Sequence, residues 1–233
     1  MIKLPALLLA LGYGLVMWFF SVWRLKGELD TKSKPLRDPL LDHQLDRMAH
    51  ELDLERIVVN VYDVEPVNGL AAPDGRIFIT RGFLSKFRAG EVTSEEMASV
   101  VAHELGHVAL GHARRRLIDF SGQNAIRAVL AGVLGRFVPF AGVAIANALA
   151  TLVAARLSRQ DEFEADAYAA ALLTRSGIGT GAQKSMFGKL GRMTGTGGTG
   201  MPAWLMSHPP TERRIAAIEA LEARWREGGL PSD

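Results

Sequence analysis

The sequence predicts a mainly helical α+β fold with a small antiparallel sheet near its start, preceded by a transmembrane helix. Three observations support this prediction. An almost unbroken apolar run opens the chain, two short runs rich in β-branched and aromatic residues follow, and apolar residues recur at helical spacing over most of the remainder. A chain of 233 residues is long enough to form one compact domain with its own core beyond the first run.

The apolar run extends from Leu4 to Trp23, about the length needed to cross a bilayer. Aromatic residues gather at its downstream end, as is typical of a membrane interface. A cleaved signal peptide is the main alternative, but the run is long for one and no small-residue cleavage site follows it. We therefore expect a single-pass anchor over residues 1–24 and a linker over 25–38.

Basic residues are more numerous after the apolar run than before it. By the positive-inside rule this favours a cytoplasmic domain, with a periplasmic or extracytoplasmic one as the alternative. Contact with membrane lipid is expected in either case.

The domain is expected over residues 39–230. Residues 56–63 and 76–80 read as two strands of the sheet, because they are rich in β-branched and aromatic residues and are separated by turn-forming residues. Apolar periodicity predicts helices at about 39–53, 93–118, 125–157, 160–175, 181–192 and 209–227.

The helical stretch at about 125–157 is a hydrophobic insertion, rich in alanine and glycine and therefore only weakly hydrophobic. Two interpretations compete. The insertion is either a helical hairpin that rests in the membrane or spans it, or a pair of helices packed within the domain, and the sequence slightly favours the second.

The composition limits the function. A formal net charge of +2 and a sequence pI near 9.0 are too mild to indicate a nucleic-acid partner. Because the chain has no cysteine, any metal ion must be held by nitrogen and oxygen atoms.

The most informative motif is His103-Glu104-Leu105-Gly106-His107, an H-E-x-x-H pattern. The stretch is predicted to be helical, because Thr93 and Glu96 form the pattern of an N-terminal capping box and apolar residues follow at helical spacing. His103 and His107 then lie one turn apart on one face and can reach a single zinc ion. Glu104 lies beside that ion, where its carboxylate can take a proton from an attacking water.

A zinc hydrolase of this kind needs a third protein ligand. One large class places a histidine six residues after the motif, but that position is Ala113, and His112 lies on another face of the helix and is expected at the surface. A glutamate on a second helix, with an aspartate four residues later, is the other arrangement, and Glu162 and Asp166 have that spacing. In this interpretation Glu162 binds zinc, while Asp166 accepts a hydrogen bond from a ligand histidine and fixes its orientation.

The chain resembles the HtpX and CAAX prenyl protease-like gluzincin metallopeptidases, a family that includes BepA-type and Oma-type members. The resemblance covers roughly residues 45–222. It is carried by the H-E-x-x-H motif, by Ser158 to Asp166, by Ser207-His208-Pro209-Pro210 with Arg214-Ile215, and by Asn68 to Gly75 running into Arg76 to Thr80.

The resemblance implies one zinc ion per chain and a protein or peptide substrate. It implies that residues 75–80 form an edge strand over the metal that pairs with an extended substrate, so that Asn68, Ala71, Gly75 and Ile77 are expected substrate-binding residues. It further implies that His208 faces the metal as an extra ligand or a donor to the oxyanion, and that Arg214 anchors an acidic group behind the ligands.

The sequence thus predicts a membrane-anchored zinc endopeptidase that cleaves misfolded or membrane-associated proteins. A metal-stabilised chaperone or scaffold that binds unfolded segments without cutting them is the alternative, and a zinc hydrolase of a non-peptide bond is a second one. A general base at Glu104 argues against the chaperone, because a structural zinc has no need of one. The sequence leaves the oligomeric state open.

Overall fold

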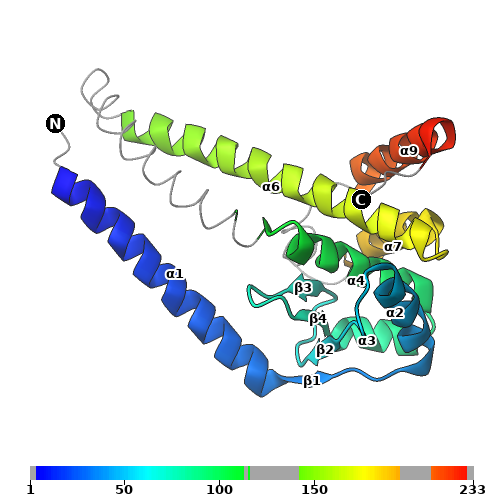
Figure 1. Ribbon diagram of the computed structural model, residues 1–233. Helices are drawn as coiled ribbons and strands as arrows, with labels where there is room; N and C mark the ends of the chain where they lie inside the picture. The colour runs from blue at the N-terminus through cyan, green and yellow to red at the C-terminus, as the bar shows by residue number, and fades with distance from the viewer. Residues whose placement is uncertain (1–3, 113–114, 116–141, 195–210, 230–233) are drawn as a thin grey trace. The chain divides into compact units, whose positions relative to one another are not determined.

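The computed structural model describes residues 4–112, 115, 142–194 and 211–229 (Figure 1). By its internal contacts the chain divides into two compact units. Residues 1–30 with 111–160 form the first unit, and residues 31–110 with 161–233 form the second. The second unit holds the β-sheet and every predicted site residue that the structure describes.

Helix α1 (Leu4–Lys32) is 29 residues long and continues through most of the range predicted as a linker. Most of its large apolar side chains with a described position are exposed, among them Phe19 and Trp23, which are 62% and 70% exposed. Among the described residues, no helix is both long and apolar enough to cross a membrane, so the predicted transmembrane span is not confirmed.

Helix α6 (Gly142–Arg175) is one continuous helix of 34 residues. It joins two predicted helices, because the second half of the hydrophobic insertion continues without a break into the stretch predicted at 160–175. The start of the insertion, at 125–141, lies outside the described residues.

The second unit contains a sheet of four short strands: β1 (Ser33–Pro35), β2 (Val59–Tyr62), β3 (Gly69–Ala71) and β4 (Ile77–Thr80). Their spatial order is β1-β2-β4-β3, and β2 and β4 pair in parallel while the other pairs are antiparallel. The prediction of a purely antiparallel sheet was therefore wrong. The chain between β2 and β4 includes β3, which folds back onto β4, so β2 and β4 run in the same direction.

This strand order also corrects the predicted substrate edge. Strand β4 lies inside the sheet, between β2 and β3, so residues 75–80 do not form an edge strand. The edge strand beside β4 is β3, which was not predicted, because three residues with one glycine carry too little β-strand signal.

In the described part of the second unit, five helices accompany the sheet and the end of α6: α2 (Pro39–Glu51), α3 (Arg81–Arg88), α4 (Ser94–Ala109), α7 (Thr180–Thr194) and α9 (Thr211–Gly228). All but α3 correspond to predicted helices. Helix α2 begins where Asp38 accepts hydrogen bonds from the backbone N–H groups of Leu40 and Leu41, with Pro39 at the first helical position.

Helix α4 is central to the core of this unit, since it contacts α2, α7 and strand β3 (Figure 1). Its buried apolar residues include Met97, Val100 and Val101, and they pack in one cluster with residues of α2, α3 and the sheet. The packing around α4 therefore fixes the helix that carries the H-E-x-x-H motif.

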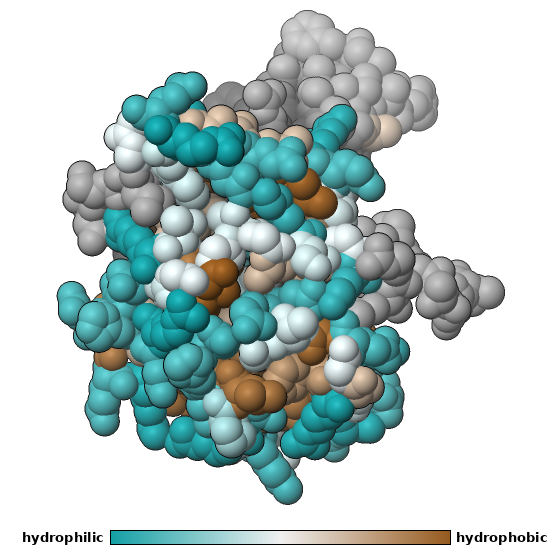
Figure 2. Space-filling view, turned by 90° about the vertical axis from the view of Figure 1, so that its right-hand side faces the viewer, coloured by the Kyte–Doolittle hydropathy of each residue, from teal (hydrophilic) through white to brown (hydrophobic). Residues whose placement is uncertain are grey.

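On the face shown in Figure 2, hydrophilic residues predominate and hydrophobic ones form small separate patches.

Candidate metal centre

The N-terminus of α4 is held by the predicted capping box. The backbone N–H of Thr93 donates to Glu96 Oε2 at 2.8 Å, and the backbone N–H of Glu96 donates to Thr93 Oγ1 at 3.2 Å. This prediction is confirmed. The helix that follows is regular through the motif, so His103 and His107 lie one turn apart on its buried side.

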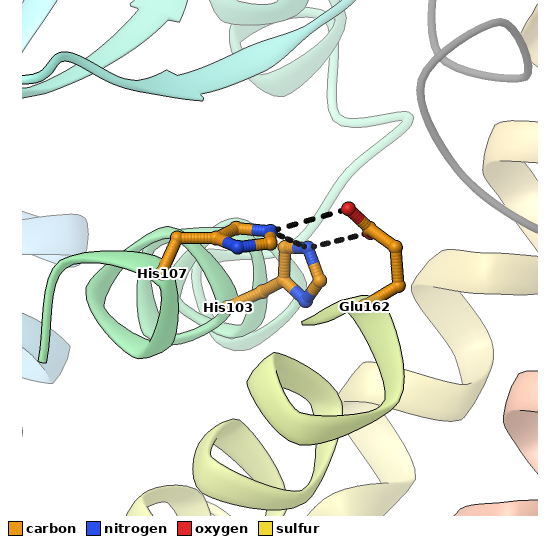
Figure 3. Close-up of side chains that lie close together, drawn as sticks. All are labelled: His103, His107 and Glu162. Atoms are coloured by element: carbon orange, nitrogen blue, oxygen red, sulfur yellow. Dashed lines mark hydrogen bonds and ion pairs between the residues drawn. The ribbon is translucent and has the colours of Figure 1, made fainter. Parts of the chain in front are cut away.

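Three side chains converge on one point (Figure 3). His103 Nε2 lies 3.4 Å from Glu162 Oε2 and 3.2 Å from His107 Nε2, and His107 Nε2 lies 3.4 Å from Glu162 Oε1. Glu162 comes from α6, and both Glu162 and His103 are 1% exposed. The three residues singled out as ligands in the sequence are thus brought together from two helices.

The spacing of these atoms suits a zinc ion. Ligand atoms bound tetrahedrally at about 2.0–2.1 Å lie roughly 3.3–3.4 Å from one another. The two histidine nitrogens are 3.2 Å apart, and each lies 3.4 Å from one of the two Glu162 oxygens, which is close to this value. The donor set of two imidazoles and one carboxylate is also typical of catalytic zinc.

Behind His103 lies a buried chain of polar contacts. Asp166, one turn after Glu162 on α6, places Oδ1 2.8 Å from His103 Nδ1. Arg214 of α9 donates to both Asp166 oxygens, from Nε at 2.7 Å and from Nη2 at 2.6 Å. The three residues His103, Asp166 and Arg214 are each 1% exposed. Asp166 and Arg214 thus lie behind His103, and the contact with Asp166 turns His103 Nε2 towards Glu162 and His107.

Burial and charge have opposite effects on the pKa values of His103 and Asp166. Burial alone lowers the pKa of His103, but hydrogen bonds to Asp166 and Glu162 outweigh it and raise the pKa to about 9. Burial alone raises the pKa of Asp166, but the charge and hydrogen bonds of Arg214 outweigh it and hold that pKa below its usual range. Asp166 therefore stays ionised and keeps its hydrogen bond to His103.

Glu104 differs from the other buried acids of the site. It is 3% exposed, and its Oε1 has no hydrogen-bond partner among the described residues. Burial raises its pKa to about 6, although the positive charge of His103 and a hydrogen bond from the backbone N–H of Ala71 act to lower it. A buried carboxylate with an unpartnered oxygen and a pKa near neutrality is suited to accept and return a proton.

The expected substrate-binding residues fall into two groups. Asn68 and Ala71 belong to the edge: Asn68 precedes β3, its backbone N–H donates to Thr80 Oγ1 at 3.0 Å, and Ala71 ends β3 beside Glu104. Gly75 lies in the turn after β3, with a φ of 84°. Ile77 lies in β4, is 3% exposed and is paired on both sides, so its backbone is not open to a substrate strand.

Sequence reasoning missed two close contacts of the site. A Cβ on Gly106 would lie 3.0 Å from the backbone of Ala165, so this glycine lets α4 and α6 approach at the ligands. The ring of Phe187 on α7 lies under the Arg214 guanidinium, 4.0 Å from ring centroid to Cζ. A glycine inside the H-E-x-x-H motif was a readable signal for the first contact, whereas nothing marks Phe187.

Two histidines complete the account. His208, expected to face the metal, lies outside the described residues. His112, expected at the surface, is instead only 1% exposed.

The fold and the site together define a metallopeptidase-type centre. Helix α4 carries His103, Glu104 and His107, and α6 carries the third candidate ligand, Glu162. The sequence agrees with this class, since the family model of "Peptidase family M48" matches residues 35–222. The chain belongs to peptidase family M48. This membership places it among the metalloproteases.

Several curated relatives carry matching names. The chain is 29% identical to Metalloprotease LoiP of Escherichia coli over 63% of its own length and 56% of that protein. It is 27% identical to Protease HtpX of Pseudomonas aeruginosa over 88% of its length and 82% of that protein. It is 30% identical to a Protease HtpX homolog of Bordetella pertussis over 77% of its length and 69% of that protein. The match thus spans little more than half of LoiP but most of the HtpX proteins.

Proposed function

We propose that this chain is a zinc-dependent endopeptidase that binds one zinc ion through His103, His107 and Glu162. The single observation that carries the proposal is the convergence of their donor atoms at 3.2–3.4 Å beside a buried glutamate, one oxygen of which has no partner in the described part of the chain. A zinc ion bound there would polarise the scissile carbonyl and make a neighbouring water easier to deprotonate.

Glu104 has the role of general base and acid. Its carboxylate takes a proton from the attacking water, whose oxygen bonds to the peptide carbonyl carbon, and delivers that proton to the leaving amine as the C–N bond breaks. Asp166 and Arg214 hold His103 in its orientation through the contacts described above. His208 remains a sequence-based proposal for a group that steadies the oxyanion.

We propose that the peptide binds by adding a strand to β3. In the β3–β4 pair, Thr80 N–H donates to Asn68 O and Ala72 N–H donates to Arg76 O, so residues 68, 70 and 72 face β4. The backbone groups of Gly69 and Ala71 therefore point away from β4, to the side on which no described strand pairs with β3. The Ala71 N–H on that side donates to Glu104, which leaves the carbonyl of the partly buried Ala71 to accept from a peptide. Recognition through the backbone would accept many peptide sequences, as cleavage of misfolded proteins requires.

We also propose that α1 holds the enzyme at a membrane, where membrane-associated proteins are within its reach. This proposal rests on the apolar sequence of the helix and on the exposure of its aromatic residues, such as Tyr13, Phe19 and Trp23. Binding of the chain to phospholipid vesicles tests it separately from the chemistry.

The decisive experiment compares four samples of the full chain in detergent with an unfolded protein substrate. They are the zinc-loaded wild type, the wild type with a zinc chelator, Glu104→Gln, and Glu55→Gln as a matched control, since Glu55 is exposed. We expect cleavage only in the wild type and in Glu55→Gln, and one zinc ion per chain in all but the chelated sample.

The result separates the proposal from its alternatives. Retained binding of the unfolded substrate with no zinc-dependent cleavage by the wild type would overturn the peptidase and support a chaperone or scaffold. Turnover of small esters or amides but of no peptide would indicate a hydrolase of another bond.

A further inference from the structure

Strand β3 lies unusually close to helix α4 at Gly69. A Cβ on this residue would lie 2.8 Å from Cγ1 of Val100 and 3.4 Å from Oε1 of Glu104. The first separation is shorter than any that packed carbon atoms adopt, so a side chain here requires the strand or the helix to move. Gly69 is itself buried, and no positive φ explains the glycine.

Val100 cannot yield to such a side chain. It is 3% exposed, lies in the middle of α4 and belongs to the main core cluster. A β-branched side chain in a helix has essentially one rotamer, so Cγ1 has no alternative position. Because α4 is packed on several sides, the edge strand is the element that would shift.

The shift would fall on the backbone groups that matter for the substrate. The β3–β4 register turns the backbone groups of Gly69 and Ala71 away from β4, to the side of β3 on which no described strand pairs and where the proposed peptide strand adds. A methyl group at residue 69 would also contact the Glu104 carboxylate oxygen that has no hydrogen-bond partner among the described residues. The position of the paired peptide relative to Glu104 thus depends on residue 69 being a glycine, which has no side chain.

We propose that Gly69 is a positioning residue for peptide cleavage: its lack of a side chain sets the distance between the substrate edge β3 and the helix that carries Glu104. This inference rests on the proposed function. It makes the contact between Gly69 and Val100 a determinant of turnover rather than only of packing.

The test is a second-site rescue in the zinc-loaded full chain. The variants are Gly69→Ala, Val100→Ala and the double variant. Gly181→Ala serves as the matched control, because a Cβ on Gly181 meets nothing within 4 Å. For each, kcat/KM on a fluorogenic peptide, zinc content and melting temperature are measured.

We expect Gly69→Ala to lower kcat/KM by about 10–100-fold, as misplacement by about 1 Å can do, while zinc content stays at one per chain. Val100→Ala removes the Cγ1 atom that the new methyl group meets, so the double variant should match Val100→Ala within about threefold. Gly181→Ala should match the wild type. Should Gly69→Ala fail to fold, agreement between the double variant and Val100→Ala remains the required result.

Two results would overturn the inference: wild-type kcat/KM in Gly69→Ala, or an equal loss in Gly69→Ala and in the double variant. If either occurs while the wild type cleaves and Glu104→Gln does not, only the role of Gly69 is lost. If the wild type itself cleaves nothing, the proposed function fails and this inference fails with it.

Discussion

Two buried glutamates on helix α4, eight residues apart, have opposite surroundings. Glu96 is 4% exposed and Glu104 is 3% exposed. The Glu96 carboxylate accepts hydrogen bonds from Lys189 Nζ at 2.6 Å, Ser185 Oγ at 2.6 Å and the backbone N–H of Thr93 at 2.8 Å. Glu104 has one oxygen without any partner among the described residues.

The pKa values follow these surroundings. Burial alone raises the pKa of Glu96, but the hydrogen bonds from Lys189 and Ser185 outweigh it and lower the pKa. Burial raises the pKa of Glu104 to about 6, because the positive charges of His103 and Arg214 and the hydrogen bond from Ala71 do not offset it. The difference teaches that the same residue on one helix stabilises the fold where it is fully partnered, and is available for chemistry where it is not.

The largest expected effect is that of replacing Glu104, the glutamate proposed to act in catalysis. Glu104→Gln should lower kcat for peptide cleavage by about 10²–10⁴-fold, because an amide cannot accept the proton. Its melting temperature should not fall, since the variant removes a buried carboxylate that lacks a full set of partners. Peptide kinetics and thermal unfolding of the same samples check both parts. A variant that keeps activity but unfolds earlier would make Glu104 a structural residue like Glu96.

The second effect concerns the hydrogen bonds of Asp166 and Arg214 behind His103. Arg214→Lys keeps the charge but loses the paired donors to Asp166, so we expect zinc affinity to fall by about 10–100-fold. Arg214→Met leaves Asp166 buried without its cation and should cost about 3–5 kcal/mol of folding free energy. Competition with a zinc-binding dye and urea unfolding measure the two quantities. Arg213→Lys, at the exposed neighbouring position, is the control and should change neither.

Helical periodicity explains why the grouping of the candidate ligands could be predicted from the sequence. His103 and His107, like Glu162 and Asp166, are four residues apart, and on a helix that spacing alone puts both side chains on one face. The capping box at Thr93 and Glu96 is equally local and was also predictable. Which two helices meet was supplied by the family resemblance rather than by the spacing.

The sheet could not be predicted in the same way, because strand order depends on partners far apart in sequence. Residues 56–63 and 76–80 carried a clear strand signal, yet nothing in them distinguishes parallel from antiparallel pairing. Strand β3 is too short to show a pattern, although Gly69 fits the rule that a glycine within a strand marks a close approach of another element. The edge strand predicted at residues 75–80 is therefore an inner strand, and β3 lies at that edge of the sheet.

A third, smaller effect is expected from replacing Glu96, the glutamate that stabilises the start of α4. Glu96→Gln loses the charged contact to Lys189 and weakens the cap, so we expect about 1–3 kcal/mol lower folding free energy. The activity of the folded protein should stay at the wild-type level, since Glu96 lies two turns from the metal centre. Urea unfolding and kcat at a temperature well below the melting transition provide the two readings. A loss of kcat without a loss of stability would contradict the assignment of Glu96 to the fold.

The smallest effect is the pH dependence that Glu96 contributes. Because its pKa in the folded protein lies below the usual value of 4.5, its ionised contacts stabilise the fold fully above that value and are lost as the pH falls through the folded pKa. The difference in folding free energy between the wild type and Glu96→Gln should therefore be constant from about pH 7 to about pH 5, and shrink below about pH 4.5. Urea unfolding of both proteins at several pH values measures it, with Glu55→Gln as an exposed control. A difference that grows as the pH falls would mean that the neutral form of Glu96, and not its contact with Lys189, stabilises the start of α4.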